Sequence, residues 1–378
     1  MIYLNNAATS WPKAPGVADA VRQSLEHPAS DVGRGGGGDA GPVNQCRELM
    51  RRRLGVADAS RIVFTLNATA ALNLAIQGAA LARGDLLVTT AAEHNSVLRP
   101  AEKLRQERGI QVQIVGLASD GSLDEDAFQR ALARGPRLVV VSHASNVTGR
   151  VFPVGRLFGA AKEAGALTVL DAAQSLGLLP VLPQALHADI VVFTGHKGLL
   201  GPAGVGGLYV APGIDLHQML VGGTGVRSDV REHPPQMPLR LEAGTHNLPG
   251  LAGFAAALEW LERDGQNLAA TAACRGAFLR RELSGIPGVQ IFDADGGCER
   301  VGVVSFRIGG WDVGEAGAIL DQSFQIACRA GLHCAPLIHP WIGSAPSGTL
   351  RFSVSGFTTE DEISAAAEVV RRLARNAR

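Results

Sequence analysis

The sequence lacks an excess of charge of either sign, and it lacks a long uninterrupted apolar run. Its 35 Lys and Arg residues balance 35 Asp and Glu residues, so no overall field attracts nucleic acid or an anionic membrane. No apolar stretch reaches the length of a membrane span, and the first residues, 1–6, have neither the basic segment nor the apolar run of a signal peptide. These absences predict a soluble, cytoplasmic protein that acts on a small molecule.

The sequence also lacks paired cysteines. It contains five, none of them in a Cys-x-x-Cys arrangement: Cys46, Cys274, Cys298, Cys328 and Cys334. An odd number argues against a complete disulfide framework. We therefore expect reduced thiols, one of which is available as a reactive group.

The length and the pattern of the chain predict an α/β protein with two domains. A chain of 378 residues exceeds one ordinary core and suggests a large domain with a smaller companion. Short β-branched runs alternate with segments of helical period such as 68–82 and 153–164. The near-continuous apolar character of these runs is typical of a mostly parallel central sheet covered on both faces. The expected strands are 61–65, 85–89, 111–115, 137–142, 167–170, 189–193 and 207–210.

The pattern changes after the last of these strands. Residues 221–249 are rich in Gly, Pro and charge, and we expect a long functional loop there because regular patterns resume on both sides. A smaller α+β unit follows, with helices at 251–264, 268–284, 313–322 and from 359, and strands at 301–308 and 350–354. The expected division is an N-terminal segment, 1–15, that packs with the small domain, a large domain, 16–250, and linking helices with a small domain, 251–378.

Polar side chains follow two of the expected strands. Asp171 and Gln174 come after 167–170, and Lys197 comes after 189–193. Ligands of open α/β sheets bind beyond the carboxyl ends of the strands. An ammonium group there loses hydration, which lowers its pKa and frees a nucleophilic amine. This pairing of an amine with a carboxylate suits a pyridoxal phosphate (PLP) site, in which an acid keeps the ring nitrogen protonated.

Two further strand ends carry suitable groups. Asn67, Ala68 and Thr69 open a helix, where N–H groups can bind a phosphate, and His94 follows another strand. Each residue alone has a plainer interpretation: a solvated loop lysine, an N-cap aspartate, a helix-start threonine, or an ordinary hydrogen-bonded histidine. Their occurrence together at successive strand ends favours the cofactor site.

The motifs taken in order resemble those of the class V aminotransferases, which are PLP enzymes of fold type I, and within them the cysteine desulfurase and selenocysteine lyase group. The resemblance runs from Tyr3-Leu4-Asn5-Asn6-Ala7-Ala8-Thr9, where the family has Asp in place of Asn5, to Arg351-Phe352-Ser353. It includes Asp171-x-x-Gln174 and Thr194-Gly195-His196-Lys197.

The resemblance implies a role for each site residue. Lys197 would bind the cofactor covalently, Asp171 would pair with its ring nitrogen, and Gln174 would bind its ring hydroxyl. His94 would stack on the ring, and Asn146 would contact the ring hydroxyl and the substrate carboxylate. The phosphate would be held by Ala68, Thr69, Thr194 and His196, and by Thr245 of a neighbouring subunit, which implies a homodimer.

The segment Arg329-Ala330-Gly331-Leu332-His333-Cys334-Ala335 resembles the sulfur-acceptor segment of the desulfurases. Arg329 and His333 are expected to favour the Cys334 thiolate as cationic or partly cationic neighbours, and Arg329 to contribute to the substrate site. Arg351 resembles the arginine that grips the substrate α-carboxylate, a bidentate task. The plainer interpretations are an inert buried thiol for Cys334, a structural Arg329, and an Arg351 paired with a carboxylate of the chain.

The expected reaction converts L-cysteine, or a related amino acid, to L-alanine with a persulfide on Cys334, which a sulfur-acceptor protein then receives. Lys197, Cys334 and His94 are the expected catalytic residues, and no metal is expected. Two departures bear on the substrate. The family has a histidine near Gly37, where this chain has only Gly35 to Gly38, and Ala70 stands where the family often has Glu.

Other functions remain open from the sequence. A selenocysteine lyase, another C–S lyase or an aminotransferase would use the same scaffold. A nicotinamide-binding Rossmann protein is disfavoured, because the glycine run does not follow a convincing strand with an acidic residue about twenty positions beyond. A non-catalytic sulfur-relay or scaffold protein is disfavoured by the presence of Lys197 and Cys334.

Overall fold

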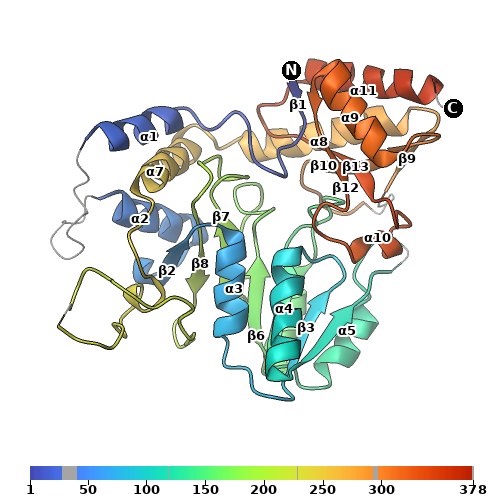
Figure 1. Ribbon diagram of the computed structural model, residues 1–378. Coiled ribbons are helices and arrows are strands. Elements are labelled where there is room, and N and C mark those ends of the chain that lie inside the picture. The colour runs from blue at the N-terminus through green and yellow to red at the C-terminus, as the bar shows by residue number, and fades with distance from the viewer. Residues whose placement is uncertain (28–40, 119, 228, 293–296, 377–378) are drawn as a thin grey trace.

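The computed structural model describes residues 1–27, 41–118, 120–227, 229–292 and 297–376, and is built around a seven-stranded sheet (Figure 1). All neighbouring strands are parallel except β8, which is antiparallel to both β2 and β7. The predicted mostly parallel sheet is therefore confirmed, with strand limits that agree to within one residue. In spatial order the strands are β2 (Ile62–Thr65), β8 (Gly206–Val210), β7 (Ile190–Thr194), β6 (Leu167–Asp171), β5 (Leu138–Ser142), β3 (Leu86–Thr90) and β4 (Gln111–Val115).

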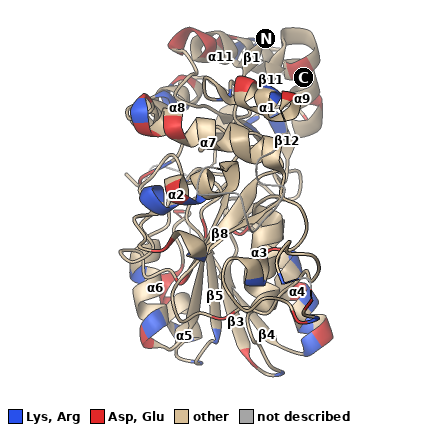
Figure 2. Cartoon of the chain, turned by 90° about the vertical axis from the view of Figure 1, so that its left-hand side faces the viewer, with Lys and Arg blue, Asp and Glu red and all other residues tan. Residues whose placement is uncertain are grey.

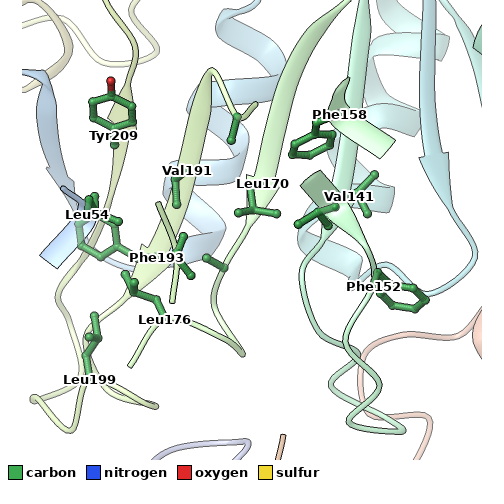
Figure 3. Packing of buried hydrophobic residues seen from close by; sticks show 14 of the residues in the cluster. Leu54, Val141, Phe152, Phe158, Leu170, Leu176, Val191, Phe193, Leu199 and Tyr209 are labelled. Carbon is green, nitrogen blue, oxygen red and sulfur yellow. The ribbon is translucent and has the colours of Figure 1, made fainter. Parts of the chain in front are cut away.

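Helices cover both faces of this sheet because successive strand side chains point to opposite sides. Val139 and Val141 pack toward one face, whereas Leu138 and Val140 pack toward the other. The first face is covered by α2 (Pro42–Leu54), α5 (Glu125–Leu132), α6 (Val154–Glu163) and α7 (Leu248–Arg263), and the second by α3 (Ala68–Gly78) and α4 (Asn95–Arg108). Figure 3 shows part of the first face, where Phe158 lies beside Val141 and Leu170. Helix α1 (Val17–Glu26) packs on α7.

A second, four-stranded sheet lies above the first in Figure 1. Its order is β12 (Arg329–Gly331), β13 (Thr349–Ser353), β10 (Val303–Ile308) and β9 (Val289–Ile291). The core of this unit joins the sheet to α8 (Leu268–Ser284), α9 (Val313–Phe324) and α11 (Glu360–Arg375). A short helix, α10 (Ile338–Trp341), follows β12.

The N-terminal segment contacts this second unit. Strand β1 (Ile2–Tyr3) pairs in parallel with β11 (Ile326–Ala327), and Leu4 is fully buried in the same core. This contact brings residues far apart in the sequence together in the second unit. The domain limits at 15/16 and 250/251 stay predictions.

Charged residues of both signs occur on the helices around the sheet (Figure 2). In Figure 2, positive and negative segments alternate over the helices that flank the sheet, and the strands between them are mostly uncharged. Within the described ranges, no helix combines the length and apolarity needed to cross a membrane. The glycine run Gly35 to Gly38, where a family histidine is missing, lies outside the described residues.

The predicted loop at 221–249 is largely irregular, apart from a 3₁₀ turn at Leu239–Leu241 and the start of α7. A buried ion pair attaches it to the large unit: Arg47 of α2 donates two hydrogen bonds to the Glu242 carboxylate, at 2.9 and 2.7 Å. Glu242 also accepts the Phe64 N–H at 2.7 Å and lies 3.1 Å from His246. These contacts hold the part of the loop that carries Thr245.

We predict that Arg47→Met destabilises the protein by about 3–5 kcal/mol, because it leaves the Glu242 carboxylate buried without its guanidinium. The double variant Arg47→Met/Glu242→Gln should recover most of this loss. Chemical denaturation of both variants measures the free energy of unfolding. The Glu242→Gln single variant is measured in the same way, and a loss in the double variant equal to the sum of the two single losses would show that the two residues are not coupled.

Candidate active site

The carboxyl ends of β3, β5, β6 and β7 form the floor of a cavity of about 220 Å³. Strand register places Ser142 beside Asp171, and Asp171 beside Val192, two residues before Thr194 on β7. Most of the predicted site residues line the cavity: Ala68, Thr69, His94, Asn146, Asp171, Gln174, Thr194, His196, Lys197, Arg329 and Arg351. The structure therefore brings together side chains from both sheets and from the loops between them.

Asp171 and Lys197 are held close because their two loops touch. Gly177 has a φ of 97°, and a Cβ there would lie 2.3 Å from the carbonyl oxygen of Gly198. Only glycine permits that approach. The Asp171 carboxylate is buried and accepts one hydrogen bond, from the Ala173 N–H at 2.9 Å.

Burial changes the protonation of both groups. It lowers the pKa of Lys197 to about 8, while the Asp171 carboxylate acts in the opposite direction and Arg351 and Arg329 lower it further. Burial raises the pKa of Asp171, with the Ala173 N–H and Lys197 opposing the rise. A neutral amine is thus accessible near neutral pH. It lies beside a carboxyl group whose charged form would be stabilised by any cation brought to it.

His94 is held as a neutral ring. It caps the start of α4, where Nδ1 accepts the Ser96 N–H at 3.1 Å. Burial lowers its pKa to about 4, and Lys197 adds to this effect. Since Nδ1 is an acceptor, the proton of the neutral ring is on Nε2. The Ser96 hydroxyl also contacts Nδ1 and the Thr69 hydroxyl, each at 2.8 Å, which fixes the ring against the first turn of α3.

One end of the cavity has unused donors that fit an anion. Thr194 Oγ1 and His196 Nδ1 are buried and have no hydrogen-bond partner among the residues that the structure describes, and the first turn of α3 contributes Ala68 and Thr69. Helix N-termini favour negative charge. The amine, the carboxylate, the neutral ring and this anion site together fit PLP.

The two side-chain amides already have partners in the chain. Nε2 of Gln174 donates to the Ala7 carbonyl at 3.0 Å, and Nδ2 of Asn146 donates to the His333 carbonyl at 2.7 Å. Both side chains still line the cavity. The sequence predicted ligand contacts for both amides, and the structure adds that each also fastens a distant segment to the site.

The segment that carries Cys334 is pinned through three consecutive carbonyl groups. His339 Nε2 donates to the Leu332 oxygen at 3.1 Å, Asn146 to His333, and the Asn95 N–H to Cys334 at 2.7 Å. These bonds stabilise an uncommon backbone, because His333 and Cys334 have φ values of 51° and 61°. Non-glycine residues in this region cost of order 1–3 kcal/mol each.

The Cys334 thiol contacts Arg329, whose Nη2 donates to Sγ at 2.8 Å. Cys334 does not itself line the cavity, but Arg329 does. A guanidinium at this distance stabilises a thiolate. The thiol is therefore connected to the cavity through a shared cation.

The expectation that His333 is partly cationic was wrong. Burial lowers its pKa to about 2, with Arg351 adding to the effect. Its Nε2 must donate to the Thr349 hydroxyl at 2.8 Å, because that hydroxyl donates to Ser305, which donates in turn to the Val147 carbonyl. The neutral ring therefore anchors the segment, and Arg329 is the cation at the thiol.

Sequence reasoning missed Glu93. This buried carboxyl accepts hydrogen bonds from the Thr90 hydroxyl at 2.6 Å and from both the N–H and hydroxyl of Ser142. Burial raises its pKa to about 7. It ties the ends of β3 and β5 together behind the cavity. The position of Glu93 directly after a strand was the feature of the sequence that could have identified it.

Thr245 lies elsewhere, in a groove of about 290 Å³ next to α3. Three apolar side chains in or beside this groove are exposed: Leu66 by 67%, Met219 by 43% and Leu220 by 72%. The two hollows share α3, because Thr69 and Leu72 line the cavity whereas Ala70 and Asn73 line the groove.

Comparison with known proteins places these features in a family. The aminotransferase class-V model matches residues 2–365. A probable cysteine desulfurase of Methanothermobacter thermautotrophicus is 32% identical, over 99% of this chain and 94% of its own length. Probable cysteine desulfurase 2 of Mycobacterium leprae is 34% identical, over 96% and 89%. The apo structure of a cysteine desulfurase from Thermococcus onnurineus NA1 has a TM-score of 0.89 at 29% identity, covering 99% of this chain and 95% of its own. The predicted fold is thereby confirmed.

We predict that acylation of Lys197 in the cofactor-free protein is half-maximal near pH 8, since its pKa is about 8. Asp171→Asn should move the midpoint to lower pH, because the carboxylate is the group that raises this pKa. Mass spectrometry of the labelled peptide measures the profile, with exposed Lys103 as the internal reference. A midpoint near that of a free lysine, about 10.4, or one that Asp171→Asn leaves in place, would contradict the prediction.

Proposed function

This chain belongs to the class-V aminotransferase family of PLP-dependent enzymes, and we propose that it is a cysteine desulfurase with Cys334 as the sulfur acceptor. The observation that carries the proposal is the contact of Arg329 Nη2 with Cys334 Sγ at 2.8 Å, made by an arginine that also lines the cavity of Lys197 and Asp171. A thiol in contact with a guanidinium and a PLP site therefore adjoin each other. The relatives named above are themselves cysteine desulfurases.

The proposed cofactor contacts follow from the cavity. Lys197 would bind the aldehyde covalently, Asp171 would hold the ring N–H, and Gln174 would reach the ring hydroxyl. His94 would present its neutral ring to the cofactor face. The phosphate takes the free hydrogen-bonding groups of Thr194 and His196 and the first turn of α3, with Ala68 and Thr69. When bound, PLP supplies an electron sink for a carbanion at the substrate α-carbon.

The proposed reaction uses four side chains of the chain. Arg351 holds the substrate α-carboxylate, with Asn146 beside it, and the Lys197 amine removes the α-proton. The Cys334 thiolate attacks the substrate sulfur: a sulfur–sulfur bond forms, and the carbon–sulfur bond breaks with its electron pair remaining on carbon, which takes up a proton. The balance is L-cysteine and a thiol giving L-alanine and a persulfide, and no external oxidant is required.

We predict that Cys334→Ser keeps the absorption band of bound cofactor but releases L-alanine from L-cysteine at least about 100-fold more slowly, because the nucleophile is lost. Cys328→Ser is the matched control. Cys328 is a half-buried thiol in the same part of the chain, and burial raises its pKa to about 12, so this variant should keep its turnover.

Mass analysis after exposure to L-cysteine should find one additional sulfur atom on Cys334 in the wild type and in Cys328→Ser. Full turnover by Cys334→Ser would refute the assignment of the thiol. Pyruvate and ammonia as products would instead identify a β-eliminating lyase, and amino transfer to a keto acid would identify an aminotransferase.

We also propose that the protein works as a homodimer in which the groove of Thr245 is covered by a second copy. The support is the exposed apolar rim at Leu66, Met219 and Leu220, together with the attachment of the loop through Glu242. By its resemblance to the family, Thr245 then reaches the phosphate of the other subunit. A cytoplasmic, reducing compartment suits the five free cysteines, and a sulfur-acceptor protein would receive the persulfide sulfur.

Mixed dimers test this arrangement. Lys197→Ala and Thr245→Ala subunits are each expected to be weakly active alone. If Thr245 acts on the neighbouring subunit, a mixed dimer has one site with both residues intact and should recover activity. Recovery on mixing, measured by alanine release against concentration-matched unmixed subunits, supports the shared site. No recovery in a verified mixed dimer would place Thr245 outside it.

A further inference from the structure

The chain between β12 and β13, residues 332–348, leaves the second unit and packs on the large one. Leu350, on β13, belongs to the core of the second unit, whereas Ala335 and Ile338 are buried in the core of the large unit. In Figure 1, α10 lies below the second sheet, on the side that faces the large unit. Cys334 therefore lies where the chain passes from one core to the other.

At the end of α10, Trp341 makes a further contact with the large unit. A Cβ at Gly116, directly after β4, would overlap Cζ2 and Cη2 of the indole and would lie 3.0 Å from Cζ3. The φ of Gly116 lies outside the left-handed region, so what glycine supplies here is room for the indole rather than backbone freedom. The indole is 49% exposed, so it rests on the large unit without being enclosed by it.

The same short helix is connected to the backbone of Cys334 through His339. The buried ring donates from Nε2 to the Leu332 carbonyl at 3.1 Å, and its Nδ1 contacts the Ser344 hydroxyl at 2.6 Å. On the other side of the segment, the Asn95 N–H of α4 donates to the Cys334 carbonyl at 2.7 Å. A shift of α10 is therefore transmitted to Leu332 and, two residues on, to Cys334.

The placement of the Cys334 thiol matters for sulfur transfer. The thiol contacts Arg329, which lines the cavity, but Cys334 does not line it. Reacting atoms must come within about 3–3.5 Å of each other, and a misplacement of about 1 Å slows a reaction severely. The left-handed backbone of His333 and Cys334 costs energy and persists only while surrounding contacts hold it. Contacts that hold the segment on the large unit therefore bear directly on the reaction.

We propose that Trp341 is a positioning residue for Cys334: its indole, seated on Gly116, holds α10 on the large unit and thereby fixes the thiol beside Arg329. The inference rests on the proposed function, because it concerns the thiol that receives the sulfur. It adds that sulfur transfer depends on a contact outside the cavity, between a half-exposed ring and a glycine that both lie apart from the cavity lining.

The test is a double-mutant cycle of Trp341→Ala and Gly116→Ala in the holoenzyme. The first change removes the indole and the second displaces it with a Cβ, so each breaks the same contact. Each single variant should release L-alanine from L-cysteine about 10- to 100-fold more slowly than the wild type. The double variant should match Trp341→Ala to within about twofold, because no indole remains to be displaced.

Two controls separate positioning from general damage. Gly159→Ala, in α6, is the matched glycine control, because a Cβ there would make only ordinary contacts at 3.6 Å or more, and it should keep its turnover. In both single variants, the absorption band of bound cofactor and the Kd of L-alanine, measured by absorption titration, should equal those of the wild type. L-alanine has no sulfur to transfer, so its binding does not involve the thiol.

A second readout needs no turnover. Asn95 is the first residue of α4, so its N–H has no partner within the helix and donates to the Cys334 carbonyl instead. In both single variants this N–H should exchange with solvent at least about 10-fold faster. The next N–H, that of Ser96, is capped by the neighbouring imidazole and should exchange as in the wild type. Hydrogen exchange with mass spectrometry of overlapping peptides measures both rates.

The outcomes separate this inference from the proposed function. If the wild type releases no alanine, the proposed function fails, and exchange of the Asn95 N–H alone decides whether Trp341 positions Cys334. Wild-type exchange of this N–H in Trp341→Ala overturns the inference. So does full alanine release by Trp341→Ala when the wild type is active, or a loss of L-alanine binding as large as the loss of turnover. A double variant in which the two single losses multiply also overturns it, because the indole and the glycine would then act separately.

Discussion

The site depends on keeping a lysine amine out of water at the end of β7. That loss of hydration lowers the pKa of Lys197 to about 8 and raises that of Asp171, so the pKa values of both groups depart from their ordinary range for one reason. Arg329 and Arg351 add two more cations, and Asp171 is the one carboxylate among the described residues that line the cavity. Such a cavity binds anions, which suits a phosphate and a carboxylate. The same cations also explain why the histidines are neutral, since they would repel a protonated imidazole.

The position of the Cys334 thiol depends on a different constraint. Its segment has a strained backbone, which long-range hydrogen bonds stabilise. The two left-handed residues, His333 and Cys334, persist because donors from α4, from the end of β5 and from α10 occupy three consecutive carbonyls. A glycine contact closes the base of the segment: a Cβ at Gly348 would lie 2.2 Å from the Gly331 oxygen. The relay from His333 through Thr349 and Ser305 reaches Val147 of the large unit. The segment is thus fixed between the two sheets.

The sequence was most informative where periodicity and strand ends coincide. Apolar runs located the strands of the large sheet, and residues directly after them, such as Asp171 and Lys197, identified the cavity. The sequence was least informative about which distant group each side chain hydrogen-bonds. Nothing local indicates that the Asn146 amide donates to His333, or that the Gln174 amide donates to Ala7. His333 was misjudged for the same reason, because its charge depends on burial and on Arg351, which follows it by eighteen positions.

The sequence by itself determined the fold class, the order of the elements and the chemical types available at each strand end, because alternation of apolar residues and turn chemistry are local properties. Tertiary structure alone decided which charges remain uncompensated. Asn5 and Arg351 are separated by almost the whole chain, and only the packing of the N-terminal segment beside β13 brings an amide oxygen to 3.3 Å from the guanidinium. Electrostatic compensation depends on distance and burial, and neither is encoded at any single position.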